Sequence, residues 1–400
     1  MPDRALLDTT AGRVIAALAA ALVLAVLAGL VALWPRGSEA PPEAPAQAGA
    51  SERARVVAIE RGGCEQWSGR GCRRVAIALD DGRRSFLTLE GGRFAPPLQT
   101  GDRILVARNG AGPAAAAEPE LDDRAQQPPF AFQDFQRTSP LLFLALAFVA
   151  LVLALGRWHG ARALIGLGVS LWLVIEFLAP AILDGRPLVL TALVGALAVM
   201  VVTILLSHGA GLKSLAAMLG TAGALLLTTV LAVVAVRGAD ITGLSSDPST
   251  ILLAGVEGHV SLQGLVIAGI VVGALGVLDD VTVSQASTVL ALRRANPALG
   301  FRRLLGEALA VGRDHLGATV NTLVLAYAGA ALPVLLIFDT ARTPFGDAVN
   351  GEPVAEQIVA MLVGSIGLIA AVPLTTAIAA LLASRMPATA VREEHHGHAH

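Results

Sequence analysis

Long apolar runs alternate with short polar segments along most of this chain. About 20 consecutive apolar residues are enough for a helix to cross a bilayer. Runs of that kind are expected at residues 14–33, 139–155, 163–182, 187–206, 214–236, 260–278 or further, 316–338 and 357–383. The pattern predicts an all-α polytopic membrane protein with about eight transmembrane helices.

Residues 51–110 have a different period. The runs ARVVAIE, RRVAIAL, RRSFLTL and DRILVAR alternate apolar with polar residues, and DG and GG turns separate some of them. Such alternation is typical of half-buried strands. We therefore predict a small OB- or SH3-like barrel of roughly five strands inserted between the first two membrane helices.

These two patterns divide the chain. The predicted parts are an N-terminal signal anchor (1–35), a Pro/Ala-rich linker (36–50), the β-rich domain (51–110), a second linker (111–138), a seven-helix membrane domain (139–384) and a His-rich tail (385–400). The first apolar run is longer than the core of a cleaved signal peptide, which favours a retained anchor, although Ala46-Gln47-Ala48 resembles a cleavage site.

Basic residues favour one side of the predicted membrane. One set of short loops and termini holds Arg4, Arg13, Arg157, Arg162, Lys213, Arg293, Arg294, Arg302, Arg303, Arg313, Arg385 and Arg392, and the other holds Arg186, Arg237 and Arg342. The positive-inside rule then places both termini in the cytoplasm and residues 36–138 outside it.

Composition narrows the function classes. Hydrophobic residues make up 54% of the chain, charged residues 15%, and the formal net charge is −2, which argues against a nucleic-acid partner. The sequence contains no HExxH, GxSxG or P-loop motif. We therefore expect no catalytic residues, no cofactor and no enzyme activity.

The two cysteines lie in the β-rich segment. Cys64 and Cys72 are separated by seven residues, and in an oxidising compartment this spacing allows a structural disulfide. Free thiols or a metal site are the alternatives, although no histidine lies nearby to support a metal. The four histidines of the tail could bind a transition metal weakly, or the tail could simply be solvated.

Asp279 and Asp280 are carboxylates within an apolar, glycine-rich stretch, and ionisable groups in such a place are candidates for a functional site. Two placements are open. If the helix ends at Leu278, the pair lies at the cytoplasmic mouth and one aspartate could cap the next helix. If it continues to Arg293 and Arg294, the pair lies inside the bilayer, in a helix that could break at 273–276.

A continuous helix would group further polar residues with Asp280. Ser284 and Ser287 would share its face, and this stripe would need a partner helix or water. It could be a transport site or a structural hydrogen-bond network. The nearby pair Gly269 and Gly273 has the spacing of a close helix contact.

The next segment is expected to be two elements. Asn296-Pro297 looks like a helix start, followed by an amphipathic helix lying on the membrane surface. The seventh membrane helix would then open at 313–315. Asn321 could bond to the Asp280 stripe, or Asp314, His315 and Asn321 could belong to a proton or solute path.

These motifs identify a resemblance. The stretches GALGVLDDVTVSQAS and GRDHLGATVNTLVLAYAGAALPVLL resemble the YibE/F family of bacterial multi-pass membrane proteins over residues 139–382. The resemblance implies a membrane protein of the bacterial plasma membrane. It supplies no substrate, cofactor or catalytic residue.

Two functions fit these expectations. The first is permease-like transport of a small solute or ion, with a polar site on the sixth and seventh helices. The second is a membrane scaffold whose β-domain binds an envelope partner. An intramembrane hydrolase using both aspartates is a distant third, because no nucleophile and base are paired.

Overall fold

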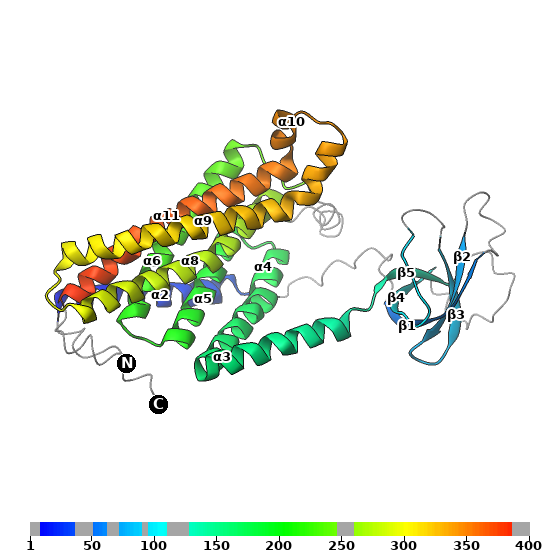
Figure 1. Cartoon of the computed structure of the whole chain (residues 1–400), viewed down its shortest axis with the longest axis horizontal. Helices are drawn as coiled ribbons and strands as arrows, with labels where there is room; N and C mark the ends of the chain where they lie inside the picture. Colours follow the sequence, from blue (N-terminus) through cyan, green and yellow to red (C-terminus); the bar gives the residue numbers. More distant parts are fainter. Residues whose placement is uncertain are drawn as a thin grey trace. The chain divides into compact units, whose positions relative to one another are not determined.

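The computed structural model describes residues 9–36, 51–61, 72–89, 95–109, 128–245 and 260–385. The chain forms two compact units, one made of residues 41–151 and the other of residues 1–40 with 152–400. The first unit holds a β-barrel, and the second holds a bundle of long helices (Figure 1).

Five strands close into the barrel. They are β1 (Glu52–Arg61), β2 (Arg73–Leu79), β3 (Arg84–Leu89), β4 (Arg103–Arg108) and β5 (Phe130–Phe135). Their order around the barrel is β1-β2-β3-β5-β4, with β3 and β5 the parallel pair. This order is that of an OB-like barrel, and alternate residues such as Val75, Ile77 and Leu87 fill its core.

The fifth strand corrects the predicted domain boundary. Residues 111–138 were expected to be a linker, but β5 lies within them. Phe130 is buried in the barrel core, and Phe132 and Phe135 pack against it. The barrel closes only because this strand pairs with both β3 and β4.

Seven helices among the described residues are long and apolar enough to cross a membrane. They are α2 (Thr10–Leu33), the continuous stretch Thr138–Leu183, α5 (Leu188–His208), α6 (Leu212–Gly238), α8 (Leu262–Ala295), α9 (Phe301–Thr340) and α11 (Glu352–Arg385). A short helix, α10 (Phe345–Asn350), connects α9 to α11 (Figure 1).

The stretch Thr138–Leu183 accounts for the difference from the eight expected helices. It consists of α3 (Thr138–Leu173), the π-helix η1 (Val174–Leu178) and α4 (Ala179–Leu183). Its backbone leaves the helical region at Arg157 (φ 48°, ψ −127°). The residues on either side of Arg157 are each numerous enough for one membrane crossing. The two predicted helices are therefore present, but one residue separates them instead of the expected seven.

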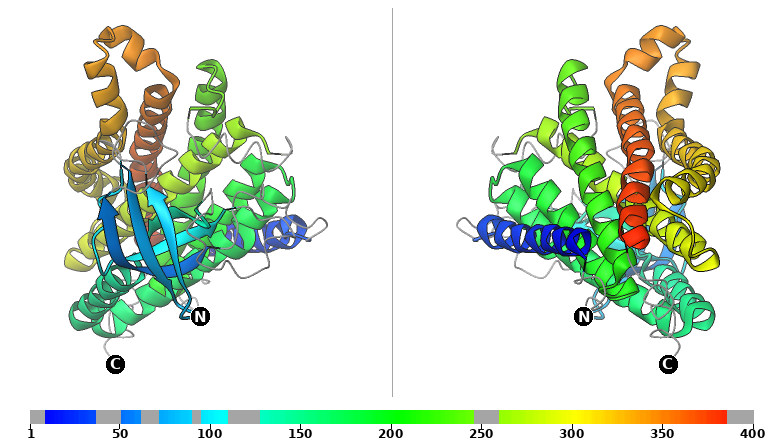
Figure 2. Two further views of the ribbon diagram at one scale, coloured as in Figure 1. Left: turned by 90° about the vertical axis from the view of Figure 1, so that its right-hand side faces the viewer. Right: turned by 90° about the vertical axis from the view of Figure 1, so that its left-hand side faces the viewer.

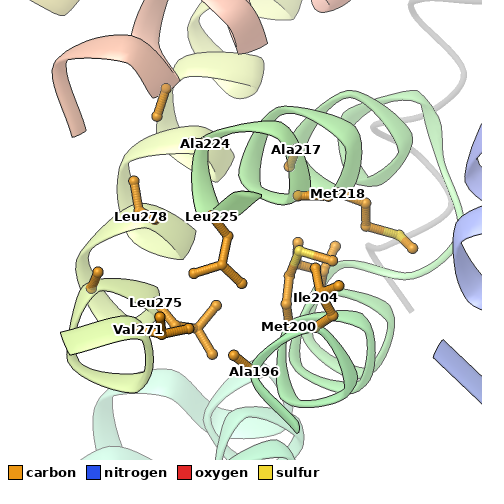
Figure 3. Close-up of a cluster of buried hydrophobic side chains, with 14 of the residues drawn as sticks. Ala196, Met200, Ile204, Ala217, Met218, Ala224, Leu225, Val271, Leu275 and Leu278 are labelled. Atoms are coloured by element: carbon orange, nitrogen blue, oxygen red, sulfur yellow. The ribbon is translucent and has the colours of Figure 1, made fainter. Parts of the chain in front are cut away.

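Helix α8 lies at the centre of the bundle and contacts α5, α6, α9 and α11. Helix α11 packs between α6 and α9 (Figure 2). Figure 3 shows part of the core, in which Met200 and Ile204 of α5, Leu225 of α6 and Leu275 of α8 point toward one another.

Glycines set the closest helix crossing. A Cβ atom added to Gly220 of α6 would lie 2.8 Å from Cβ of Thr375 in α11 and would overlap its Oγ1. A Cβ atom added to Gly367 of α11 would in turn overlap Oγ1 of Thr228 in α6. The two helices therefore exchange matching glycine–threonine contacts. The predicted close contact at Gly269 is wrong, because nothing lies within 4 Å of that position.

Candidate functional site

The two aspartates lie in the middle of a helix. Helix α8 is continuous from Leu262 to Ala295, so neither Asp279 nor Asp280 caps a helix, and the backbone does not break at 273–276. Of the two predicted placements, the longer helix is the one observed. Each aspartate is more than four turns from either end of α8.

Asp279 lines a pocket between α8, α5 and the second half of α3. The pocket has a volume of about 410 Å³. Its lining is formed by Ala163, Leu167, Ser170, Leu171, Leu173, Val174, Leu178, Gly195, Ala196, Val199, Met200, Thr203, Ser207, Val272, Leu275, Gly276 and Asp279. The walls are therefore mostly aliphatic, with three hydroxyl groups and one carboxylate.

The hydroxyl groups are partly engaged with their own helices. Oγ of Ser170 donates to the carbonyl oxygen of Gly166 at 2.8 Å and lies 3.2 Å from Oγ1 of Thr203. Each hydroxyl oxygen keeps lone pairs that can accept a further hydrogen bond. The pocket can therefore offer hydroxyl acceptors together with a carboxylate.

The carboxylate of Asp279 is not satisfied by the chain. Its Oδ1 atom is buried and hydrogen-bonds to no described residue. Among the described residues that line the pocket, none is basic. An unpaired carboxylate oxygen in such surroundings is unfavourable, and a bound proton, cation or water molecule would reduce this cost.

Asp280 and the predicted serines do not enter this pocket. Asp280 and Ser284 are exposed. The hydroxyls of Ser284 and Ser287 donate to the carbonyl oxygens of Val281 and Val283, at 2.9 and 2.8 Å. The predicted stripe therefore exists on α8, but its serine hydroxyls bond to backbone carbonyl oxygens of the same helix. The aspartate that lines the pocket is Asp279 and not Asp280.

The polar residues of α9 lie elsewhere. Helix α9 is one continuous helix from Phe301, and Asn296 ends α8, so the separate surface helix starting at Asn296 is wrong. The side of α9 that packs against the bundle includes Leu304 and Leu323. Asp314, His315 and Asn321 are all exposed, and none of them lines the Asp279 pocket.

Three buried polar residues were not singled out from the sequence. Nε2 of Gln285 donates to the carbonyl oxygen of Ala308 at 2.8 Å and fixes α9 against α8. The hydroxyls of Thr221 and Thr282 lie 2.6 Å apart and join α6 to α8. Each is a polar residue at a position where the helical period directs a side chain toward the core. That period could have identified these residues from the sequence.

No group of three or more metal-binding side chains occurs in the described ranges. Cys72 forms a disulfide, and Cys64, the other cysteine of the chain, lies outside the described residues. The histidines of the tail, for which weak metal binding and a solvated tail are the two alternatives, also lie outside the described residues.

The long apolar helices and their packing define a multi-pass membrane protein with an attached β-barrel. A family model described as YibE/F-like protein matches residues 144–385. The chain therefore belongs to the YibE/F-like family, as the two sequence motifs indicated. No curated protein and no solved structure matches the chain.

Proposed function

We propose that this protein is a permease-like transporter of the bacterial plasma membrane whose solute binds in the Asp279 pocket. The observation that supports this function is the buried, unpartnered Oδ1 atom of Asp279 in a pocket near the middle of α8. Ionisable groups at such depth are costly and are kept where they bind or move something. Coupling to a proton or another ion would use the same carboxylate.

The proposed orientation follows the basic residues. Arg293 and Arg294 end α8, Arg302 and Arg303 begin α9, and Arg385 ends α11, so these helix ends carry positive charge on one side of the antiparallel bundle. This side would face the cytoplasm. Residues 36–138, with the barrel, would then be extracytoplasmic.

Transport can be tested in proteoliposomes on a solid-supported membrane. Current is recorded after rapid addition of candidate solutes to the wild type, Asp279→Asn and Asp280→Asn. The expected result is a solute-dependent current that Asp279→Asn abolishes and Asp280→Asn retains. If the wild type gives no more current than Asp279→Asn for any solute, the proposal fails.

One observation favours a scaffold as the second candidate. On the outer face of the barrel, Ala78 of β2 pairs with Arg55 of β1 on one side and with Arg84 of β3 on the other. Both arginines are exposed. Nearby, the guanidinium of Arg74 lies 4.1 Å from the centre of the half-buried Phe86 ring. The two exposed arginines on this face suit an acidic envelope protein.

This alternative predicts a different mutational response. In a scaffold that does not transport, Arg55→Glu combined with Arg84→Glu should abolish co-purification of an acidic partner, whereas Asp279→Asn should leave it unchanged. The scaffold function is contradicted if this double variant retains the partner.

A further inference from the structure

We infer that the ligand of the Asp279 pocket is an amphiphilic organic cation, an ammonium group carried on an aliphatic or aromatic body. This inference rests on the proposed function for its biological setting, but it concerns binding and can be tested without transport. It follows from the charge, the lining and the rim of the pocket.

The charge of the pocket favours a cationic ligand. Asp279 is the one ionisable group among its lining residues, and its buried Oδ1 atom lacks a hydrogen-bond donor. Arg162, which precedes the lining residue Ala163 in α3, does not itself line the pocket, and its Nε donates to the carbonyl oxygen of Leu206 at 2.7 Å. An anionic ligand would add a second negative charge to a weakly screened site. A cation would supply the missing donor and the missing charge together.

The lining requires an apolar body. Thirteen of the seventeen lining residues are Ala, Gly, Val, Leu or Met, and the other four are Ser170, Thr203, Ser207 and Asp279. A volume of about 410 Å³ falls within the range of small-molecule sites and is far larger than a single ion needs. A bare metal cation would leave most of this apolar surface uncovered. It would also find one carboxylate where hard cations take six or more oxygen ligands.

The rim of the pocket is apolar as well. Leu167 and Leu171 of α3 and Gly276 of α8 line the pocket and are exposed. A ligand that passes this rim crosses hydrocarbon surface, which suits a molecule already dissolved in the bilayer with its charged group near the headgroups. A fully polar cation, such as a small sugar amine, would lose hydration at the rim without gaining contacts.

A series of ligands with one shared body tests this inference. Hexylammonium, hexanol and hexanoate each contain six carbon atoms and carry a positive, neutral or negative head. Equilibrium binding of each is measured by calorimetry on the purified full-length protein, for the wild type, Asp279→Asn and Asp280→Asn. Removing one partner of a buried charge pair commonly weakens binding by about 30-fold or more.

We expect hexylammonium to bind the wild type most tightly and to lose about 30-fold in affinity in Asp279→Asn. Hexanol should bind both forms equally, which also shows that the pocket of the variant is folded. Asp280→Asn should change all three affinities far less than Asp279→Asn changes that of hexylammonium. Equal binding of the three ligands, or an equal loss of hexylammonium affinity in both variants, overturns the inference.

The two proposals fail in different ways. If hexylammonium binds through Asp279 but no solute produces a current, the cation site stands and the transport function is wrong. If solutes do produce a current that depends on Asp279 while hexanol or hexanoate binds as well as hexylammonium, the transport function stands and the cation assignment is wrong. Uptake of a proton without binding of hexylammonium also refutes the cation assignment.

Discussion

Replacing Gly220 by alanine should force α6 and α11 apart. The new Cβ atom would lie 2.8 Å from Cβ and 3.1 Å from Cα of Thr375, and ordinary contacts begin at 3.4 Å. Rotating the threonine side chain moves Oγ1 but neither of these atoms. The helices must therefore separate by roughly half an ångström, and contacts along the whole crossing weaken with them.

The expected loss is about 1–3 kcal/mol, the usual range for overpacking a well-packed interior. Alanine also favours a helix over glycine by roughly 0.5–1 kcal/mol, which opposes the loss. Gly269→Ala isolates this second effect, because nothing lies within 4 Å of the Cβ position at Gly269. The net difference between the two variants measures the crossing itself.

The assay is unfolding in mixed detergent and SDS micelles, followed by tryptophan fluorescence, with monodispersity after heating as a second readout. Gly220→Ala should unfold at lower SDS fraction than Gly269→Ala. In a Thr375→Gly background, which removes both Cβ and Oγ1, the loss caused by Gly220→Ala should shrink markedly. Equal behaviour of the two alanine variants, or the same loss with and without Thr375, would refute the reasoning.

Two further predictions concern other parts of the chain. Gln285→Leu removes the hydrogen bond to the Ala308 carbonyl and should lower the free energy of unfolding by about 1 kcal/mol, measured in the same SDS titration; an unchanged midpoint would contradict it. In the barrel, hydrogen bonds from Arg137 and from the backbone N–H of Phe135 hold the pKa of Asp134 below its ordinary value of 3.8. Because the folded-state pKa is the lower one, the stabilisation is complete above pH 3.8 and fades as the pH falls further. Hydrogen-exchange protection of β5, corrected for intrinsic rates, should exceed that of Asp134→Asn at pH 6, and the difference should disappear in strong acid.

The sequence predicted which helices and strands exist more accurately than it predicted where they begin and end. The strands of residues 51–110 and the apolar helices were recognisable because their periods differ. The strand β5 was missed, although Phe130 and Phe132 alternate, since two prolines precede it and the region reads as a linker. The charged residues at 313–315 suggest a membrane boundary in the sequence, and this predicts two elements where the structure has the single helix α9. Arginine and aspartate do not stop a helix, and no proline precedes Pro333 in α9.

The candidate site could be predicted only in part. Asp279 stood out because a carboxylate is rare in an apolar run. Ser170 and Thr203 did not, because one hydroxyl on an apolar helix is usually satisfied by its own backbone, as the bond from Ser170 to Gly166 shows. They form a site because α3 and α5 meet beside α8, and local periodicity carries no information about which helices become neighbours.

The paired glycine–threonine contacts of α6 and α11 have a mechanical consequence. Gly220 and Thr228 are eight residues apart in α6, as are Gly367 and Thr375 in α11. The two helices therefore make a close glycine–threonine contact at two points, separated by about 12 Å along the helix axes. Sliding one helix along the other would drive both threonines into neighbouring backbone at once. The pair therefore resists sliding, and neither helix lines the Asp279 pocket, whose walls come from α3, η1, α5 and α8. Val174 and Leu178 of the π-helix η1 line this pocket, and π-helical turns occur frequently at functional sites.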